Sequence, residues 1–327
     1  MNVLEGRRVE LYKGAREGTV ENVVGVNQEA EYPRNPDILI CNDGSRLPED
    51  IAGEIWQSLH PWQQVADESE LQEVLGRLKK QIEFSLYTYI DLVKYGLHDD
   101  STALYSIEPA CEDKGAVIAL KYHNGLNLVG EGNSYDGKRM MRLVKHVKPS
   151  IISGRLDVVE ALHKELKGQY TMESGYVLKW AGKTPDSADP EVERAALGDC
   201  REIAQFIMGE DSIGSYYELE DMTQQLTQRM EEGMGRNYLI RREGKIVSHC
   251  ATYAELEDIA VIAGVITSPE YRHKGLFQRI FLTLVNDLSQ EGKDIYLFAF
   301  GEALPKMYEK LGMKIVGEWG RLVKDAV

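Results

Sequence analysis

A short basic loop between an apolar stretch and an amphipathic helix is the part of this sequence best suited to chemistry. The apolar stretch runs from Ile259 to Ile266, in a chain whose formal net charge is −15. The first turn of a helix has unpaired N–H groups and a partial positive charge, so it can hold a phosphate. A glycine there has no Cβ to keep the phosphate from the backbone. The loop supplies this glycine, Gly275, and three basic residues before it, Arg272, His273 and Lys274.

The spacing in this loop differs from that of the common nucleotide motifs. It is neither the GxxxxGK[ST] of a P-loop nor the GxGxxG of a dinucleotide turn. It reads Arg-x-x-Gly-x-Phe from Arg272 to Phe277. This pattern resembles the acyl-CoA-binding loop of the GNAT superfamily of N-acyltransferases, Gln/Arg-x-x-Gly-x-Gly/Ala, and the preceding Pro269-Glu270-Tyr271 is also typical. Phe277 departs from the small residue expected last. The alternative is a charged strand-to-helix connection without a ligand.

A second motif follows at the distance that the same family shows. The stretch from Ala303 to Met313 resembles the family's A-x-x-(x)-Tyr-x-x-x-Gly-Phe helix, with Met313 in place of Phe. A helix (about 274–291), a strand (294–300) and a helix (303–311) are expected around the two motifs. The resemblance implies that Tyr308 protonates the departing CoA thiolate. A phenol, with a pKa of about 10, suits that step.

The resemblance also implies an α/β fold with a mixed sheet over 190–327 and acetyl-CoA as donor substrate. The backbone at the strand end would pair with the pantetheine arm and polarise the thioester carbonyl, at Val265, Ile266 and Thr267. The loop and first helical turn would hold the pyrophosphate, at Arg272, His273, Lys274, Gly275, Leu276, Phe277 and Gln278. The expected activity is transfer of an acetyl group to a primary amine by direct attack. The first alternative function is an acyl-CoA-binding sensor without turnover. The second alternative is a phosphate-binding α/β protein that does not bind acyl groups.

The general base stays open at this stage. Glu302 follows the strand 294–300 at the carboxyl edge of the sheet, where sites in open α/β sheets gather. Glu257 and its neighbour Asp258 stand before the strand that ends at Thr267. Each could take a proton directly or through water, and each could equally be a solvated carboxylate. The glutamate that the family often carries at the place of Tyr296 is absent, and an asparagine that contacts the donor in many members appears as Gly301. Water could therefore deprotonate the amine.

An acidic stretch predicts the kind of acceptor. In the resembled fold, residues 209–221 would form one wall of the acceptor cleft. They combine carboxylates and aromatic rings: Glu210, Asp211, Glu218, Glu220 and Asp221, with Tyr216 and Tyr217. Such a wall favours a cationic amine. The alternative is a solvated loop followed by a helix N-terminus, where acidic side chains are favourable.

The order of elements predicts three regions. Residues 1–65 are expected to be a small module of short strands and turns. Residues 66–182 are expected to form an α/β domain that opens with one long helix from Asp67 towards Gly96. Its order of hairpin, helix, strand, helix and strand is similar to the order in 190–327. The region is therefore either a degenerate copy of the same fold without a second donor site or an unrelated α/β domain. A linker rich in Pro, Asp and Ser separates it from the last region.

Composition excludes several classes of function. An acidic chain with only short basic clusters is a poor binder of nucleic acid. No apolar segment is long enough for a membrane span, and the first ten residues do not read as a signal peptide. The histidines show no metal-ligand spacing. We expect a cytoplasmic protein with free thiols, because the four cysteines are far apart and make no CxxC. The sequence does not predict an oligomeric state.

Overall fold

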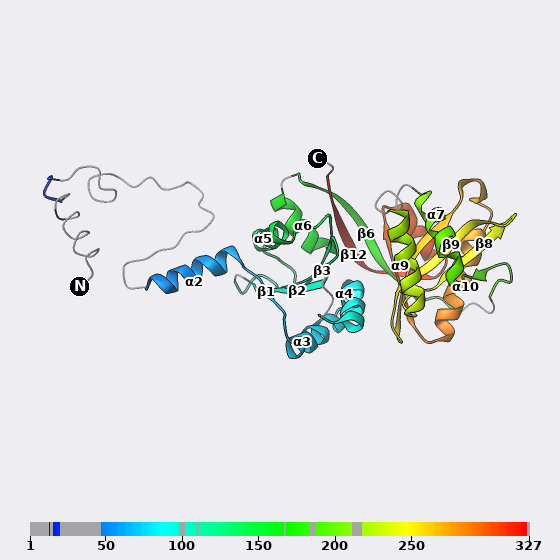
Figure 1. Cartoon of the computed structure of the whole chain (residues 1–327), viewed down its shortest axis with the longest axis horizontal. Helices are drawn as coiled ribbons and strands as arrows, with labels where there is room; N and C mark the ends of the chain where they lie inside the picture. Colours follow the sequence, from blue (N-terminus) through cyan, green and yellow to red (C-terminus); the bar gives the residue numbers. More distant parts are fainter. Residues whose placement is uncertain are drawn as a thin grey trace. The chain divides into compact units, whose positions relative to one another are not determined.

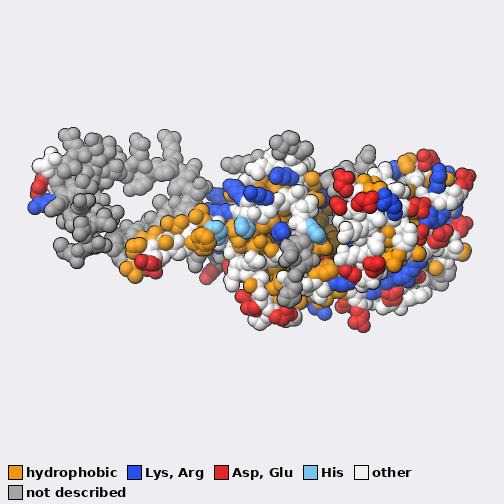
Figure 2. Space-filling view, viewed as in Figure 1, with side chains coloured by type: hydrophobic (Ala, Val, Ile, Leu, Met, Phe, Trp, Pro, Cys, Tyr) orange, Lys and Arg blue, Asp and Glu red, His pale blue; other side chains and the backbone are white. Residues whose placement is uncertain are grey.

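Figure 1 shows the computed structural model of the chain, which describes residues 13, 16–19, 47–97, 102–109, 111–166, 168–183, 188–210 and 218–325. It divides into two units, Met1–Leu59 and His60–Val327. The predicted strands before residue 47 lie outside the described residues. The first unit holds a helix, α2 (Pro48–Leu59), so the expectation of strands and turns is wrong for this stretch. Hydrophobic side chains are visible along α2 in Figure 2, and Ile55, Trp56 and Leu59 are exposed.

The second unit contains a mixed sheet of twelve strands in the order β1-β2-β3-β4-β5-β12-β6-β11-β10-β9-β8-β7. Its first strands are β1 (Gln63–Gln64), β2 (Thr102–Ile107), β3 (Val117–Tyr122), β4 (Gly125–Gly130), β5 (Ile151–Arg155) and β6 (Tyr170–Trp180). Its later strands are β7 (Glu193–Arg194), β8 (Asn237–Arg242), β9 (Lys245–Glu255), β10 (Ile259–Thr267), β11 (Asp294–Phe300) and β12 (Met313–Lys324).

The helices follow the same division. The first half of the sheet carries α3 (Glu68–Lys79), α4 (Ile82–Tyr95), α5 (Gly137–Val147) and α6 (Leu156–Leu166). The second half carries α7 (Cys200–Met208), α9 (Leu219–Glu231), α10 (Leu276–Gln290) and α11 (Ala303–Glu309). Each half therefore runs short strand, two helices, three strands, helix, strand, helix and long strand. This repeat is the pattern expected of a duplicated fold.

The two halves exchange their last strands. In each half one pair of strands is parallel, β4–β5 and β10–β11. The strand next to β5 is β12 from the end of the chain, whereas the strand next to β11 is β6 from the first half. The two long strands β6 and β12 then pair with each other in antiparallel fashion. The linker at 181–190 therefore separates two helix sets, but the sheet continues across it.

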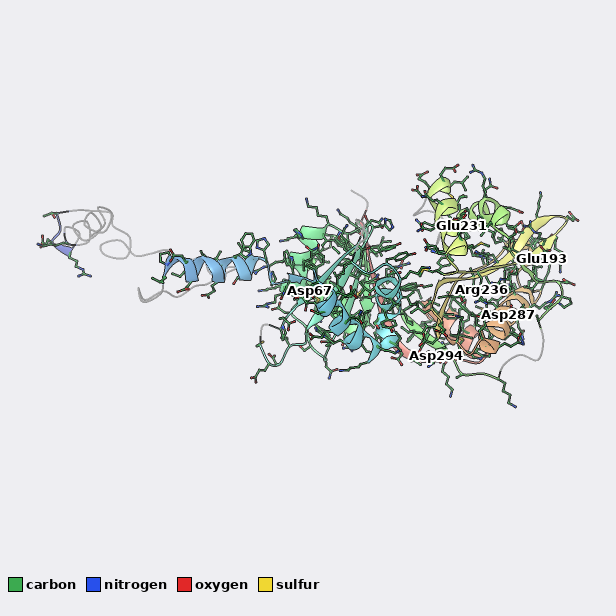
Figure 3. All side chains as sticks on the ribbon, turned by 60° about the horizontal axis from the view of Figure 1, so that its bottom comes forward. Asp67, Glu193, Glu231, Arg236, Asp287 and Asp294 are labelled. Atoms are coloured by element: carbon green, nitrogen blue, oxygen red, sulfur yellow. The ribbon has the colours of Figure 1, made fainter. Side chains whose placement is uncertain are left out.

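The long helix expected from Asp67 is broken into two. Asp67 caps α3 by accepting a hydrogen bond from the Glu70 N–H (Figure 3), and α3 ends at Lys79 before α4 begins at Ile82. Both helices contribute to one core, which includes Leu92 of α4, but only α4 also packs into a second. Buried apolar residues of α3 pack with β2, β3 and β4, whereas Leu86 and Ile90 of α4 pack on strands of the second half.

The helices cover both faces of the second half of the sheet. Buried side chains of α10 and α11 pack on one face, against β6 and β8 to β11. On the other face, α7 and α9 pack on β8, β9 and the end of β10, beside α4. The helix expected at about 274–291, the strand at 294–300 and the helix at 303–311 are confirmed within a few residues at each end.

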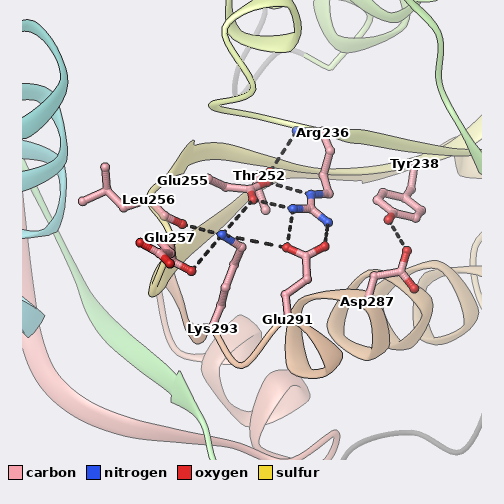
Figure 4. Close-up of polar contacts among 9 residues, drawn as sticks. All are labelled: Arg236, Tyr238, Thr252, Glu255, Leu256, Glu257, Asp287, Glu291 and Lys293. Atoms are coloured by element: carbon pink, nitrogen blue, oxygen red, sulfur yellow. Dashed lines mark hydrogen bonds and ion pairs between the residues drawn. The ribbon is translucent and has the colours of Figure 1, made fainter.

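A buried ion-pair network ties α10 to β8 and β9 (Figure 4). Arg236 donates from Nη2 to Glu255 at 2.7 Å and from Nη1 to Glu291 at 2.5 Å. Thr252 donates to Glu255, and Lys293 lies 3.7 Å from the same carboxylate. Burial opposes the charge of Arg236, but Glu291 and Glu255 outweigh it and raise its pKa.

Replacing Arg236 with Met is expected to cost about 3 kcal/mol of unfolding free energy. The change leaves the Glu255 carboxylate, only 4% exposed, with Lys293 as its remaining cation, and an underpaired buried charge is costly. Urea unfolding followed by circular dichroism measures the loss. In the control Arg201→Met, the lost ion pair with Glu220 is 55% and 74% exposed at its two side chains, so less than about 1 kcal/mol should be lost. Equal losses in the two variants would contradict this account.

Candidate active site

The loop between β10 and α10 has an open, uncapped helix start. Two residues adopt left-handed backbone conformations, His273 with φ 61° and Gly275 with φ 79°. Gly275 is the N-cap of α10 and makes no side-chain cap. A Cβ there would meet nothing within 4 Å, so glycine is favoured by its backbone angle and not by crowding. The first N–H groups of α10 are thus available to an anion from outside.

The basic residues of the loop divide into one brace and two exposed groups. Arg272 donates from Nε to the Thr267 carbonyl at 3.0 Å and from Nη2 to Glu210 at 3.1 Å. It therefore fixes the loop to the end of β10 and to the chain after α7. His273 and Lys274 are exposed, and the Lys274 ammonium lies 4.8 Å from the centroid of the Tyr271 ring. Lys274 therefore adds a positive charge that faces solvent.

The strands β10 and β11 part in the middle of the sheet. Their parallel ladder ends at the pair Ile262–Leu297, and β11 continues beside β6 as far as Phe300. On the other side, β10 stays with β9 as far as Thr267. The stretch from Ala263 to Thr267 therefore has no strand on its β11 side. This is the open backbone edge expected for Val265, Ile266 and Thr267.

A β-bulge shapes the same stretch. The register of β10 against β9 shifts between Ala263 and Ile266, and Gly264 lies in the bulge with φ 61°. A Cβ at Gly264 would lie 2.7 Å from the Tyr253 hydroxyl and 3.0 Å from Cε1 of His249. Both the backbone angle and the close neighbours therefore require glycine.

His249 supports the bulge from β9. Its Nδ1 donates to the Gly264 carbonyl at 2.6 Å, and its Nε2 lies 2.9 Å from the Asn237 side-chain amide. Burial lowers the pKa of His249 to about 4, although the hydrogen bond to Gly264 opposes the shift. The ring is neutral at physiological pH. With Nδ1 as the donor, Nε2 can only accept, so the Asn237 side-chain atom placed there as Oδ1 must be the NH₂ group. Sequence patterns gave no sign of this support.

Tyr308 lies on α11 beneath the start of α10. It is buried, and its ring contacts Phe277 and Phe281 at centroid distances of 5.5 and 5.4 Å. Burial, followed by the nearby Cys250 thiol, raises the pKa of Tyr308. The phenol therefore keeps its proton at neutral pH. The ring of Phe277 packs against Tyr308 in the core, so the departure from a small residue adds a side chain on the core side of the loop.

The structure separates the carboxylates considered as general bases. Glu302 is exposed at the N-cap of α11, directly after the turn that ends β11. Glu257 and Asp258 precede β10, whose nine residues lie between them and the loop. At about 3.3 Å per residue this is on the order of 30 Å. Glu302 is thus on the side of the sheet where the strands part, whereas Glu257 is at the opposite end of β10.

A polar cavity of about 580 Å³ lies between α9, the end of α4 and the β3–β4 hairpin. Its lining combines tyrosines, carboxylates and amides: Tyr95, Tyr122, His123, Asn124, Glu218, Asp221, Gln224, Gln225, Gln228 and Arg229. Glu218 and Asp221 of the predicted acidic wall line it. Glu220 instead pairs with Arg201, and Glu210 pairs with Arg272. Asp211, Tyr216 and Tyr217 lie outside the described residues.

Two lining residues come from α4 and β3, outside the region where sequence motifs pointed to a site. Tyr95 and Tyr122 stack at a centroid distance of 6.4 Å, and Tyr95 donates to Glu232 at 3.0 Å. Beside them, Asp91 of α4 sits among buried neighbours, with its pKa raised to about 7 because burial outweighs the charge of Arg229. The one sequence signal for Asp91 was a carboxylate placed between two apolar helix residues, Ile90 and Leu92.

The corresponding loop of the first half is filled by its own side chains. Asp136 caps α5 by accepting from the N–H groups of Lys138 and Arg139 at 3.0 and 3.2 Å. Arg155 donates to the Gly132 carbonyl and to the Tyr135 hydroxyl across the loop. A carboxylate therefore occupies the position at α5 that stays open at α10.

The described residues hold no group of three or more His, Cys, Asp or Glu side chains that could bind a metal ion. In the same part of the chain, no helix is both long and apolar enough to cross a bilayer. Cys200 and Cys250 are free and buried, whereas Cys111 is free and exposed.

Comparisons with known proteins identify a family for part of the chain and a shared fold for most of it. A family model described as the acetyltransferase (GNAT) family matches residues 200–313. Among solved structures, a Drosophila protein is 11% identical with a TM-score of 0.54, and the match covers 82% of this chain and 100% of that one. A GCN5-related N-acetyltransferase from Sphaerobacter thermophilus is 14% identical with a TM-score of 0.52, covering 82% and 97%. No curated protein matches the chain.

At 11% and 14% identity these two structures show a shared fold. Both structural matches extend well beyond the residues 200–313 that the family model matches. The family match spans the helices α7, α9, α10 and α11, and it includes the loop at Gly275 and the helix of Tyr308. The C-terminal region of this chain, with its mixed α/β sheet, therefore belongs to the GNAT family of acetyltransferases.

Proposed function

We propose that this protein is an N-acetyltransferase that moves an acetyl group from acetyl-CoA to a primary amine. The observation that carries the proposal is a convergence within the second half of the sheet. The uncapped start of α10, the parting of β10 from β11 and the buried Tyr308 all border one region. The free thiols Cys200 and Cys250 fit a reducing compartment, so we also propose a cytoplasmic location.

Each part has a role in the proposed reaction. The first turn of α10 holds the pyrophosphate of the donor, and the open edge of β10 at Val265 to Thr267 holds the pantetheine arm. A backbone N–H there polarises the thioester carbonyl, which typically contributes a few kcal/mol. The amine nitrogen attacks the carbonyl carbon, the C–S bond breaks and the thiolate takes the proton of Tyr308. The nitrogen gives up its surplus proton to water or to a carboxylate.

The proposed acceptor is a cationic amine. Glu218 and Asp221 on the wall of the cavity attract such a group, and Tyr95 and Tyr122 offer aromatic faces to it. We propose a single donor site, because Asp136 fills the equivalent position in the first half.

A regulatory protein that binds acyl-CoA without turnover is the second candidate. The observation that favours it is the Phe277 ring packed on Tyr308, which shields the proposed acid. The two candidates differ in acetyl-CoA consumption. Release of free CoA in the presence of a panel of primary amines supports the enzyme, whereas donor binding without release supports the regulatory protein.

The variant Lys274→Glu should weaken CoA binding about tenfold or more, because a lost charge-assisted contact to phosphate is worth about 1.5–3 kcal/mol. Titration calorimetry with CoA measures the change. Lys314→Glu makes the same charge change at the exposed start of β12, beside Lys179, and serves as the control. Unchanged affinity in Lys274→Glu would exclude the loop as the pyrophosphate site.

The variant Tyr308→Phe should lower kcat by about 10²–10⁴-fold while CoA affinity is retained, because the ring stays and the acidic proton is lost. Stopped assays of thiol release measure kcat, and calorimetry measures donor affinity. The matched control Tyr296→Phe removes a hydroxyl from another buried tyrosine, one that packs on the opposite face of the sheet. Wild-type turnover in Tyr308→Phe would remove this residue from the mechanism.

Removing the charges of Glu218 and Asp221 should raise the acceptor KM about fivefold with little change in kcat, as for loss of an exposed ion pair. For the wild type, the KM of a cationic acceptor should rise with salt, which screens the attraction. Glu220→Gln is the control, since Glu220 pairs with Arg201 and does not line the cavity. Turnover of neutral or acidic acceptors alone would contradict the proposed acceptor class.

A further inference from the structure

We infer that the first half of the sheet completes the acceptor site of the second half, with Asp91 of α4 as the carboxylate that receives the amino group of the acceptor. The inference rests on the proposed function and adds to it a residue that lies outside the family match. It is carried by the path of α4 over the second half, by the cavity at its end and by the residues between the two.

The helix α4 crosses the place where the strands part. Leu86 and Ile90 pack with Val261 of β10 and Tyr296 of β11 in one buried cluster. The ring of Tyr87 stacks on that of Phe298 at a centroid distance of 5.3 Å. Phe298 is the first residue of β11 beyond the ladder with β10. A helix of the first half thus covers the opening between β10 and β11 on the face away from α10.

Asp91 lies on α4 between this opening and the cavity. Tyr87, Asp91 and Tyr95 are spaced four residues apart, so they share one side of the helix. Tyr87 marks the parting of the strands, and Tyr95 lines the cavity. The carboxylate is therefore one helical turn from each, on a route from the cavity towards the open edge of β10.

Arg229 links the same route to the β-bulge. It lines the cavity from α9, and its guanidinium lies 4.8 Å from the centroid of the Tyr253 ring. The Tyr253 hydroxyl in turn borders Gly264, next to the backbone proposed to hold the thioester. Arg229 also exerts the charge that acts on Asp91. Arg229 therefore connects the cavity to Tyr253, and Tyr253 connects it to the bulge, while the charge of Arg229 reaches Asp91.

The environment of Asp91 suits proton transfer. Burial raises the pKa of Asp91 to about 7, against the opposing charge of Arg229. No hydrogen bond among the described residues stabilises its ionised form. A primary ammonium group entering the site can donate one proton to this carboxylate. The neutral nitrogen then attacks the thioester, its second surplus proton leaves to solvent, and Tyr308 protonates the sulfur.

The other charged or titratable groups near Asp91 are accounted for. They come from α4, β3, the hairpin turn, the start and body of α9 and the turn after α9: Lys94, Tyr95, Tyr122, His123, Glu218, Asp221, Arg229 and Glu232. Lys94 lies 3.5 Å from Glu232, so these charges are paired. Burial, followed by Glu232, raises the pKa of Tyr95, which keeps it protonated. His123 is exposed in the hairpin turn, and the variant His123→Gln tests the one histidine that lines the cavity.

The test compares Asp91→Asn with the control Glu231→Gln. Glu231 lies exposed at the end of α9 (Figure 3), so the control removes one negative charge from the same region. The probes are acetyl-CoA with cadaverine, tyramine or a short peptide with a free N-terminus, and the best of them is used throughout. We expect Asp91→Asn to lower kcat/KM for the amine about 100-fold and to leave CoA affinity unchanged. The rise of kcat through about pH 7 should disappear in Asp91→Asn and persist in His123→Gln.

A stability measurement separates this role from a structural one. The pKa of Asp91 is raised in the folded protein, so folding favours the protonated acid, and wild-type stability falls as pH rises from about 4 to 7. The Asn side chain has no such loss. The Tm of Asp91→Asn should therefore match the wild type near pH 4 and exceed it at pH 8. A residue kept for its structural contacts would give a lower Tm on replacement at both pH values.

The outcomes distinguish a failure of the proposed function from a failure of the role of Asp91. If the wild type consumes no acetyl-CoA with any of the amine probes, the proposed function itself is contradicted. An active wild type whose Asp91→Asn variant retains kcat/KM and its pH dependence would overturn the role of Asp91 and leave the proposed function standing. A fall of the same size in Glu231→Gln would also overturn it, since the effect would then follow net charge and not position.

Discussion

The pairing of β6 with β12 is the constraint on which the rest of the second unit depends. It joins Tyr170–Trp180 to Met313–Lys324 along nearly their whole length. Because β6 also pairs with β11 and β12 with β5, each half of the sheet is completed by a strand of the other. The carboxyl end of β11 is held by β6 on one side, and its ladder with β10 on the other side ends at Ile262–Leu297. The opening at the proposed donor site follows from this arrangement.

The two halves have the same element order but differ at the loop before their third helix. The loop before α10 ends in Gly275 and leaves the helix start open, whereas the loop before α5 ends in Asp136, whose carboxylate caps the helix. A fixed carboxylate repels a phosphate from the N–H groups that would bind it. The first half instead lends α4 to the other face of the second half, where Tyr87 covers the parting of the strands. In the proposed function, the second half thus provides the donor loop and the first half a wall of the acceptor site.

Local patterns in the sequence predicted those parts of the fold that depend on neighbours in the chain. The strand at 294–300 was predicted with its observed bounds, because it has a clear apolar pattern and a turn signal at its ends. The break between Lys79 and Ile82 was missed because it contains no glycine or proline. Past this break α4 also packs into a second core, which no local pattern records.

The candidate site likewise has parts that local motifs predicted and parts that depend on tertiary contacts. The loop at Arg272 to Gln278 and the helix of Tyr308 are local motifs, so the sequence sufficed to find them. The bracing of Arg272 by Glu210, the support of Gly264 by His249 and the place of Asp91 all join residues far apart in the chain. Tertiary packing brings such pairs together, and a single sequence holds no signal for it.

Hydrogen–deuterium exchange with and without acetyl-CoA tests the central claim most directly, that this duplicated fold has one working donor site at the start of α10. The account predicts that acetyl-CoA protects the amides from Val265 to Gln278 and leaves those from Glu131 to Arg139 unchanged. Protection of the first-half loop, or no protection at either loop under saturating donor, would contradict it.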